Sequence, residues 1–135
     1  MKKKIVFAVI LLLLIPCSIA SASKKQDNPY GDPFKIRTTC YLPTGNKTAS
    51  GTVPKMFRTI AGRKEDIGKT CIVYSINDDG SIGHVIFIGE IEDTGGPFIR
   101  SGQRIDIFVD TMEDAENWID IYGDYTMIQI IEGEG

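Results

Sequence analysis

The chain has 135 residues, of which 15 are lysine or arginine and 18 are aspartate or glutamate, so its formal net charge is −3. This length is enough for one hydrophobic core and too short for two domains. With an acidic balance and no basic stripe to neutralise phosphates, the composition argues against nucleic acid as a partner.

The N-terminus has the three parts of a secretory signal peptide. Lys2–Lys4 form a positive segment, the apolar run Ile5–Ile15 follows, and Ala20-Ser21-Ala22 matches a small-x-small cleavage site. The apolar run is about half of the roughly 20 residues that span a membrane. We therefore predict that residues 1–22 are removed, and that the mature chain is secreted or associated with the cell wall without stable membrane insertion. Twelve basic and 18 acidic residues then remain, a formal charge of −6.

Residues 23–34 are polar and contain Gly31 and Pro33, which predicts a flexible linker before a folded domain over residues 35–132. Within the domain, runs rich in β-branched and aromatic residues lie between turn signals and predict short strands. These strands are Ile36–Leu42, Thr70–Ile76, Val85–Ile91, Arg104–Asp110 and Thr126–Ile131. The turn signal Asn77-Asp78-Asp79-Gly80-Ser81 joins the second and third of them into a predicted hairpin.

The segment Arg104–Asp110 alternates between an apolar and a mixed face, and Asp106, Phe108 and Asp110 share the mixed one. A helix is predicted directly after it, over Met112–Tyr122, because Ala115, Trp118, Ile119 and Tyr122 recur at helical spacing. Gly123 is expected to end this helix. Asp110 is predicted to cap its N-terminus, with Glu113 reaching back.

Five or six strands and one short helix in about 100 residues predict an all-β fold. A closed barrel suits such short strands because closure removes the exposed sheet edges.

Cysteine usage predicts one disulfide. Removal of the signal peptide takes away Cys17, for which lipidation is disfavoured by the preceding Pro16, and leaves Cys40 and Cys71. An even pair in an oxidising compartment favours a bridge, and two buried free thiols are the alternative. A metal site from these cysteines and His84 lacks the usual ligand spacing, so neither a metal nor another cofactor is expected.

Asp93-Thr94-Gly95-Gly96 places a carboxylate beside a hydroxyl and a flexible turn whose amides can hold it. Aspartic proteases use the same Asp-Thr-Gly tripeptide, one copy per subunit in the dimeric forms. A secreted aspartic protease dimer is therefore one candidate. Against it, the chain has Gly96 where such proteases usually have alanine.

The order of motifs along the chain resembles the 3D domain, a family named for its aspartates. The resemblance runs from about Ile36 to Ile131. The segments that carry it are Thr38-Thr39-Cys40-Tyr41-Leu42-Pro43-Thr44-Gly45, Thr48-Ala49-Ser50-Gly51, Thr59-Ile60-Ala61, Ile67-Gly68-Lys69-Thr70, Asp93-Thr94-Gly95-Gly96 and Ser101-Gly102-Gln103-Arg104-Ile105-Asp106-Ile107-Phe108-Val109-Asp110.

The resemblance implies a six-stranded double-psi β-barrel, related to lytic transglycosylases that cleave the MurNAc–GlcNAc bond of peptidoglycan glycan strands. It also implies that Asp106 is the catalytic acid and that Asp93 supports it. The same motifs supply the candidate substrate-binding residues, which are Thr39, Tyr41, Ser50, Gly51, Thr94, Gly95 and Gly96.

The carboxylates themselves favour a transglycosylase over a hydrolase. Asp106 and Asp110 lie about 13 Å apart along a strand, which fits neither a retaining nor an inverting pair. A lytic transglycosylase needs one carboxyl group only, because the C6 hydroxyl of the substrate is the nucleophile.

One departure from the family leaves a second interpretation open. Arg63-Lys64 stands where the family usually has Asp-Pro, so one customary aspartate is absent or displaced to Asp66. A non-catalytic barrel that binds the cell wall is the alternative function.

Overall fold

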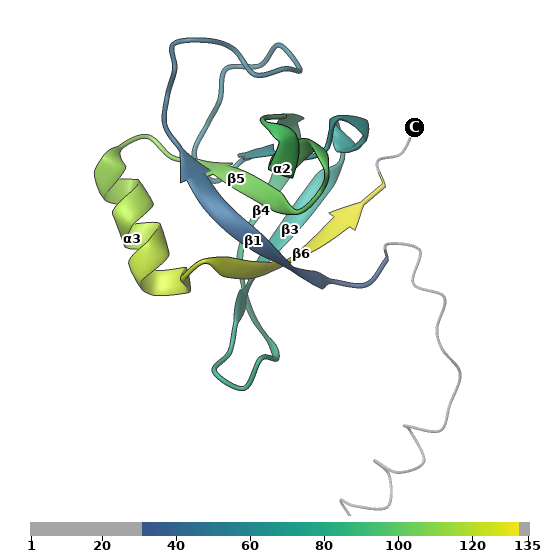
Figure 1. The fold of residues 1–135 in the computed structure, drawn as a ribbon, viewed down its shortest axis with the longest axis vertical. Helices are drawn as coiled ribbons and strands as arrows, with labels where there is room; N and C mark the ends of the chain where they lie inside the picture. Colours follow the sequence, from purple (N-terminus) through teal and green to yellow (C-terminus); the bar gives the residue numbers. More distant parts are fainter. Residues whose placement is uncertain (1–30, 133–135) are drawn as a thin grey trace, which may run out of the picture.

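Six strands pair in a complete ring in the computed structural model, which describes residues 31–132 (Figure 1). The strands are β1 (Phe34–Tyr41), β2 (Thr59–Ala61), β3 (Thr70–Ile76), β4 (Ile82–Asp93), β5 (Arg104–Phe108) and β6 (Tyr125–Ile131). The predicted signal peptide, the lipidation site considered at Cys17 and most of the predicted linker lie outside the described residues. No helix within residues 31–132 is long and apolar enough to cross a membrane.

The ring order is β1-β5-β2-β4-β3-β6, and it mixes parallel and antiparallel pairs. β1 runs parallel to β5 and β2 runs parallel to β4, while the other neighbours are antiparallel. The predicted fold, a closed six-stranded barrel of the double-psi type with one short helix near the C-terminus, is confirmed. The hairpin of β3 and β4 and the helix α3 (Met112–Tyr122) also lie where the sequence predicts them.

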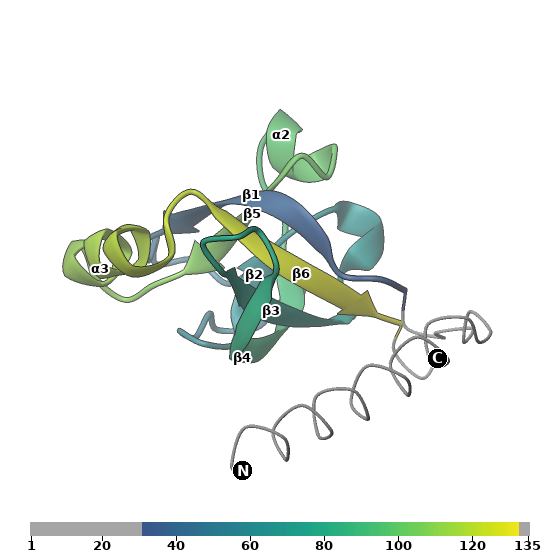
Figure 2. The same cartoon turned by 90° about the horizontal axis from the view of Figure 1, so that it is seen from below.

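Three short elements escaped prediction. β2 has only three residues, too few to show alternation, although all three are buried. The 3-10 helix η1 (Lys64–Asp66) and the one-turn helix α2 (Pro97–Arg100) are likewise shorter than any periodic signal. Figure 2 shows α2 standing off the barrel on the side of β1 and β5, with α3 at one end.

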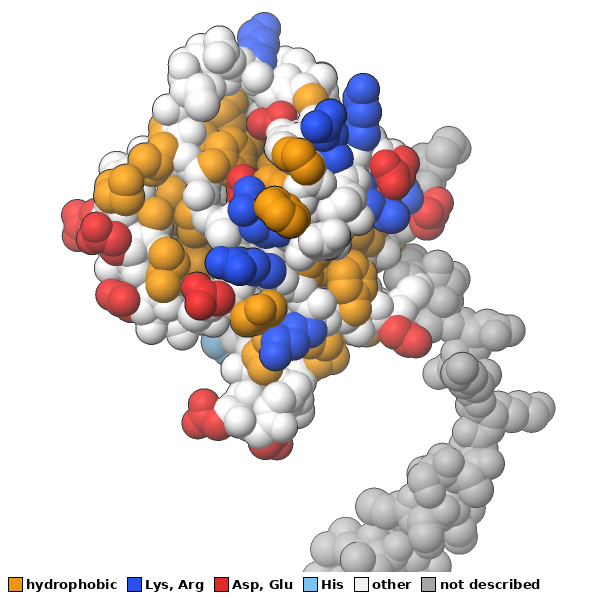
Figure 3. Space-filling view, viewed as in Figure 1, with side chains coloured by type: hydrophobic (Ala, Val, Ile, Leu, Met, Phe, Trp, Pro, Cys, Tyr) orange, Lys and Arg blue, Asp and Glu red, His pale blue; other side chains and the backbone are white. Residues whose placement is uncertain are grey.

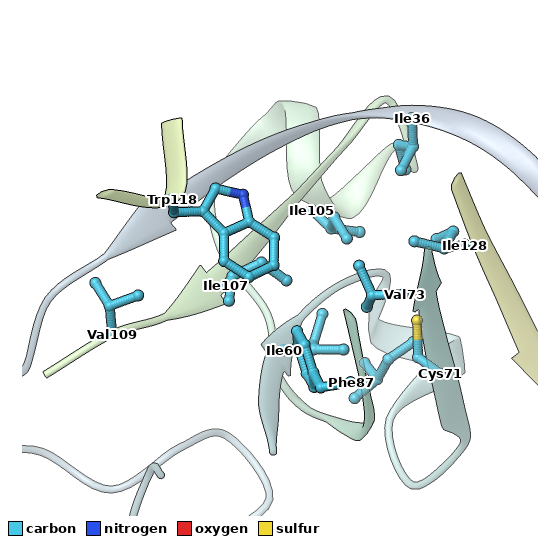
Figure 4. Packing of buried hydrophobic residues seen from close by; sticks show 11 residues of the cluster. Ile36, Ile60, Cys71, Val73, Phe87, Ile105, Ile107, Val109, Trp118 and Ile128 are labelled. Carbon is cyan, nitrogen blue, oxygen red and sulfur yellow. The ribbon is translucent and has the colours of Figure 1, made fainter. Parts of the chain in front are cut away.

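Branched aliphatic side chains from all six strands fill the barrel, and α3 closes one end. Ile60, Val73 and Ile128 are fully buried there, and Trp118 of α3 belongs to the same buried cluster, where it lies beside Ile107 (Figure 4). Each such side chain contributes about 1.5–3 kcal/mol relative to an exposed position. Ile119, expected on the inner face of the helix, is instead half exposed.

The helix cap is one residue later than predicted. Thr111, not Asp110, is the N-cap residue of α3: its hydroxyl accepts from the amide of Asp114 at 3.1 Å. The Asp114 carboxylate accepts from the Thr111 amide at 3.1 Å, which completes a capping box with Asp114 in the place predicted for Glu113. Asp110 is exposed before the cap.

The predicted disulfide is absent, since Cys40 and Cys71 are both free thiols. β6 separates their strands, and β1 pairs with β6 only through Phe34–Arg37, before Cys40 is reached. Cys71 faces Ile130 near the far end of β6, so the two backbones lie well beyond the roughly 7 Å that a bridge spans. Burial, with Asp106 nearby, raises the pKa of the Cys40 thiol to about 11, and burial raises that of Cys71 to about 12.

The capping box gives a matched pair of variants. Thr111→Ala should lower the free energy of unfolding by about 1 kcal/mol, because it removes the hydroxyl that satisfies the Asp114 amide. Asp110→Ala should change it by less than about 0.5 kcal/mol. Urea denaturation measures both, and equal losses would contradict the assignment of the cap.

Candidate functional site

The two candidate catalytic aspartates lie in one row across four neighbouring strands. Thr39 of β1 is registered with Asp106 of β5, Asp106 with Ala61 of β2, and Ala61 with Asp93 of β4. Partners in register share a face of the sheet. The two aspartates therefore flank a small alanine, with their backbones roughly 10 Å apart.

A β-bulge turns Asp93 onto this face. Ile60 is registered with Ile91 but Ala61 with Asp93, so Glu92 is an extra residue in β4. In a regular strand Asp93 would share the inward face of Ile91. The bulge re-aims it, and it leaves two consecutive carboxylates, Glu92 and Asp93, on the side of Thr59 and Ala61.

Asp93 is held by three donors from three segments. Its Oδ1 accepts from the amides of Ala49 at 3.0 Å and Thr94 at 2.9 Å, and its Oδ2 accepts from the Tyr41 hydroxyl at 3.2 Å. Burial and the adjacent Asp93 carboxylate raise the pKa of Tyr41 far above its ordinary value, so the phenol remains a donor. Asp93 thus ties the long loop 42–58 to the barrel.

Asp106 has fewer hydrogen-bond donors than Asp93. The Thr39 hydroxyl donates to its Oδ1, and Arg104 Nε lies 3.6 Å from the same oxygen. Its side chain is 18 % exposed. Within the described residues, nothing donates to its other oxygen, Oδ2, which leaves that atom available to a ligand.

A cavity of about 220 Å³ contains both aspartates. Tyr41 and Thr94 line it with them, and the hydroxyl of Thr94 is buried there without a hydrogen-bond partner in residues 31–132. An unsatisfied buried hydroxyl is rare enough to suggest a ligand contact. The remaining lining residues were not predicted as site residues and are Leu42, Thr44, Asn46, Lys47, Pro54, Ala61 and Phe108.

The cavity continues along the loop into a second hollow of about 470 Å³. The two share Thr44, Asn46, Lys47, Pro54 and Phe108, and Asp110 lines the outer one. The two hollows therefore adjoin.

Several predicted substrate-binding residues support the site without lining this cavity. Ser50 hydrogen-bonds to Thr48 and Thr52 within the loop. Gly51 makes the loop turn at φ 87°, Gly95 packs on Ile99, and Gly96 begins α2. Thr39 acts through Asp106 instead of lining the cavity.

Glu92, which sequence analysis missed, anchors the loop from its other side. Its carboxylate is buried and accepts from Thr52 at 2.6 Å, Arg58 at 2.8 Å and Thr59 at 2.8 Å. Burial acts to raise the pKa of Glu92, but these hydrogen bonds and the Arg58 charge outweigh it, and the pKa lies below its ordinary value.

Gly89 allows the same loop to approach. The carbonyl of Arg58 accepts from the Glu90 amide at 2.7 Å, and a Cβ at Gly89 would stand only 2.4 Å from that carbonyl oxygen. Only glycine permits this contact without a shift of the backbone.

Asp66 does not replace the customary aspartate at this site. It is buried in η1 and paired with Arg63 Nε at 2.8 Å and Lys69 Nζ at 2.9 Å. These three residues line a separate cavity of about 400 Å³ that contains neither Asp93 nor Asp106. Among the described residues, no cluster of three histidine, cysteine or acidic side chains is arranged to hold a metal ion.

No family model matches the chain, and no curated protein is similar to it at a significant level. Solved structures are similar in fold. MltA from Escherichia coli, described as having a unique lytic transglycosylase fold, is 20% identical over 67% of this chain, with a TM-score of 0.48. MltA with bound chitohexaose is 19% identical over 67%, with a TM-score of 0.47. The chain covers 28% of each, and at this level the likeness carries no conclusion about activity.

Glu92→Gln should lower the free energy of unfolding by about 2 kcal/mol at neutral pH, because the amide cannot accept all three charge-assisted hydrogen bonds. The pKa of Glu92 is lower folded than unfolded, so its stabilisation is present above its ordinary pKa of 4.5 and is lost as the pH falls through the folded value. The difference between the two proteins should therefore shrink as the pH falls below about 4.

Denaturation across pH measures this difference. Glu90→Gln, an exposed neighbour on β4, is the control and should behave as wild type. A pH-independent loss in Glu92→Gln would contradict the role of its charge.

Proposed function

We propose that the chain is an extracytoplasmic lytic transglycosylase that cleaves the MurNAc–GlcNAc bond of peptidoglycan, with Asp106 as general acid and base. The observation that carries the proposal is the row Thr39–Asp106–Ala61–Asp93, whose two carboxylates line one cavity that adjoins a second hollow along the loop. The motif resemblance to the 3D domain supports the same assignment, independently of the weak similarity of the solved structures.

Asp106 Oδ2 is the proposed proton donor, because Thr39 donates to Oδ1 and leaves Oδ2 for the ligand. The protonated carboxyl group gives its proton to the glycosidic oxygen as the bond from that oxygen to C1 of MurNAc breaks. The C6 hydroxyl of the same sugar then attacks C1, and the Asp106 carboxylate takes the hydroxyl proton. The products are a 1,6-anhydro end and a free C4 hydroxyl, and no water is consumed.

The other residues of the row position this chemistry. Thr39 fixes the rotation of the Asp106 carboxyl group. Asp93 holds Tyr41 and the loop amides in place, so it is a positioning residue through its three hydrogen bonds. The unpaired hydroxyl of Thr94 is available to a sugar hydroxyl in the cavity.

The alternatives differ in their products. Incubation with purified peptidoglycan, followed by mass spectrometry of the soluble fragments, should release anhydro-muropeptides. Binding without release would favour a wall-binding barrel, and cleavage of peptide bonds would favour the aspartic protease.

Asp106→Asn should fold normally and lose at least about 10²-fold in turnover, since the amide cannot donate and recover a proton. Release of anhydro-muropeptides measures the rate. Asp120→Asn on the exposed side of α3 is the matched control and should retain wild-type turnover. A folded Asp106→Asn protein with wild-type turnover would contradict the assignment of Asp106 as the general acid and base.

Ala61→Leu tests the position of the cavity. The alanine side chain lies between the two aspartates, and a leucine there would fill part of the 220 Å³ that the sugar is proposed to occupy. We expect binding of glycan fragments to weaken at least about tenfold, or 1.4 kcal/mol. Unchanged affinity, measured by calorimetry on a folded variant, would place the binding site elsewhere.

A further inference from the structure

A second row, beside the one that holds Asp106, carries positive charge. Arg37 of β1 is registered with Arg104 of β5 on one side and with Tyr125 of β6 on the other. Arg37 is two residues before Thr39, and Arg104 two before Asp106. Side chains two residues apart on a strand share a face. This arginine row (Tyr125–Arg37–Arg104) therefore lies roughly 7 Å from the row Thr39–Asp106–Ala61–Asp93.

Within the described part of the chain, the two arginines have only one acidic partner between them. Like charges directly opposite on neighbouring strands destabilise a sheet. The side chain of Arg37 has no hydrogen bond or ion pair to any residue in 31–132. Arg104 has one acidic neighbour, Asp106 at 3.6 Å, and its Nε is buried without a hydrogen bond.

Two other arginines pair with buried carboxylates, whereas Arg100 is exposed at the end of α2 and makes no ion pair within residues 31–132. Arg58 binds Glu92 and Arg63 binds Asp66, both at 2.8 Å. In a chain with a net charge of −3, two arginines that face each other with a single acidic partner are a local feature that does not follow from the composition. Figure 3 shows lysine and arginine side chains gathered over β1 and β5 on this face.

A shallow hollow of about 580 Å³ lies next to the row. Lys35, Arg37, Gln103 and Tyr125 provide its polar groups, and Lys35 Nζ stands 4.7 Å above the Tyr125 ring. The hollow offers two cations, an amide and an aromatic face, a combination that suits a carboxylate carried on a sugar or peptide.

We propose that the arginine row and this hollow form a subsite for carboxylate groups of the substrate. The inference rests on the proposed function, because the carboxylates are those of the peptide stem or, where no stem is attached, of the lactyl group of muramic acid. A carboxylate between Arg37 and Arg104 relieves their repulsion. A carboxylate bound there also positions the glycan chain so that one of its glycosidic bonds lies at Asp106. The subsite therefore distinguishes peptidoglycan from uncharged chitin-like glycans.

The test compares two forms of one ligand. Soluble muropeptide strands are prepared untreated and with their carboxylates converted to amides, and calorimetry gives the Kd of each for the Asp106→Asn protein, which does not consume them. We expect untreated strands to bind about tenfold more tightly. Arg37→Gln in the same background should reduce this preference to about threefold or less.

Lys64→Gln removes one exposed positive charge outside both rows and should keep the full preference. Arg37→Gln should not lower the melting temperature, because it removes a repulsion. If Arg37 only stabilised the fold, Arg37→Gln would lower the melting temperature and leave the preference for untreated strands unchanged.

Equal affinity for both ligand forms, or a preference that survives Arg37→Gln, overturns the inference. In strands with a peptide stem the lactyl carboxyl group is an amide, and removal of the peptides frees it. If stripped strands also bind more tightly than their amidated form, the subsite accepts a carboxylate on the lactyl group; if they do not, the preference belongs to the carboxylates of the peptide stem. Release of anhydro-muropeptides by the wild type is scored separately. Its failure would contradict the proposed function, while the Kd ratio still decides the carboxylate subsite.

Discussion

The β-bulge at Glu92 is the constraint on which the candidate site depends. One extra residue in β4 places two consecutive carboxylates on the same side of the sheet. Glu92 then binds the end of the loop nearest β2, and Asp93 binds its middle through the Ala49 amide. Without the bulge, Asp93 would turn into the apolar barrel and the loop would lose the anchor at Ala49.

The loop is held mainly by polar contacts, and the barrel beneath it by apolar ones. Thr52, Arg58 and Thr59 converge on a single buried carboxylate, which is stable there because every donor finds an acceptor. Ile60 and Ile91, next to these residues along their strands, face the opposite side and are fully buried in the core. The two kinds of interaction alternate residue by residue, so the site is built on a rigid support.

The fold was largely predictable because its longer strands carry clear patterns. Thr70–Ile76 and Met112–Tyr122 were placed to the residue, since β-branched runs and helical spacing are local signals. The bulge, β2 and the role of Glu92 depend on pairing between distant segments, which no local pattern reports. The cap shifted from Asp110 to Thr111 because both residue types cap helices and backbone geometry selects between them.

The prediction of a disulfide was wrong because it, too, depends on how distant segments are arranged. Compartment and an even count predict that cysteines pair, but strand order decides whether two of them can meet. For the site, Asp93, Asp106, Tyr41 and Thr94 were placed together by the order of motifs. Ala61 lay within one of these motifs, yet its position between the aspartates is visible only in the register.

Closure of the ring has a consequence for the order of folding. β1 is synthesised first, but both of its neighbours, β5 and β6, come from the last third of the domain. Until those strands are synthesised, β1 has no partner strand. Thr39 and Asp106, which are 67 residues apart, cannot yet form their hydrogen bond. Such non-local pairing slows folding, because the entropy cost of closing a long loop comes before any stabilising contact is formed. The cavity that both aspartates line is therefore expected to form among the last events of folding.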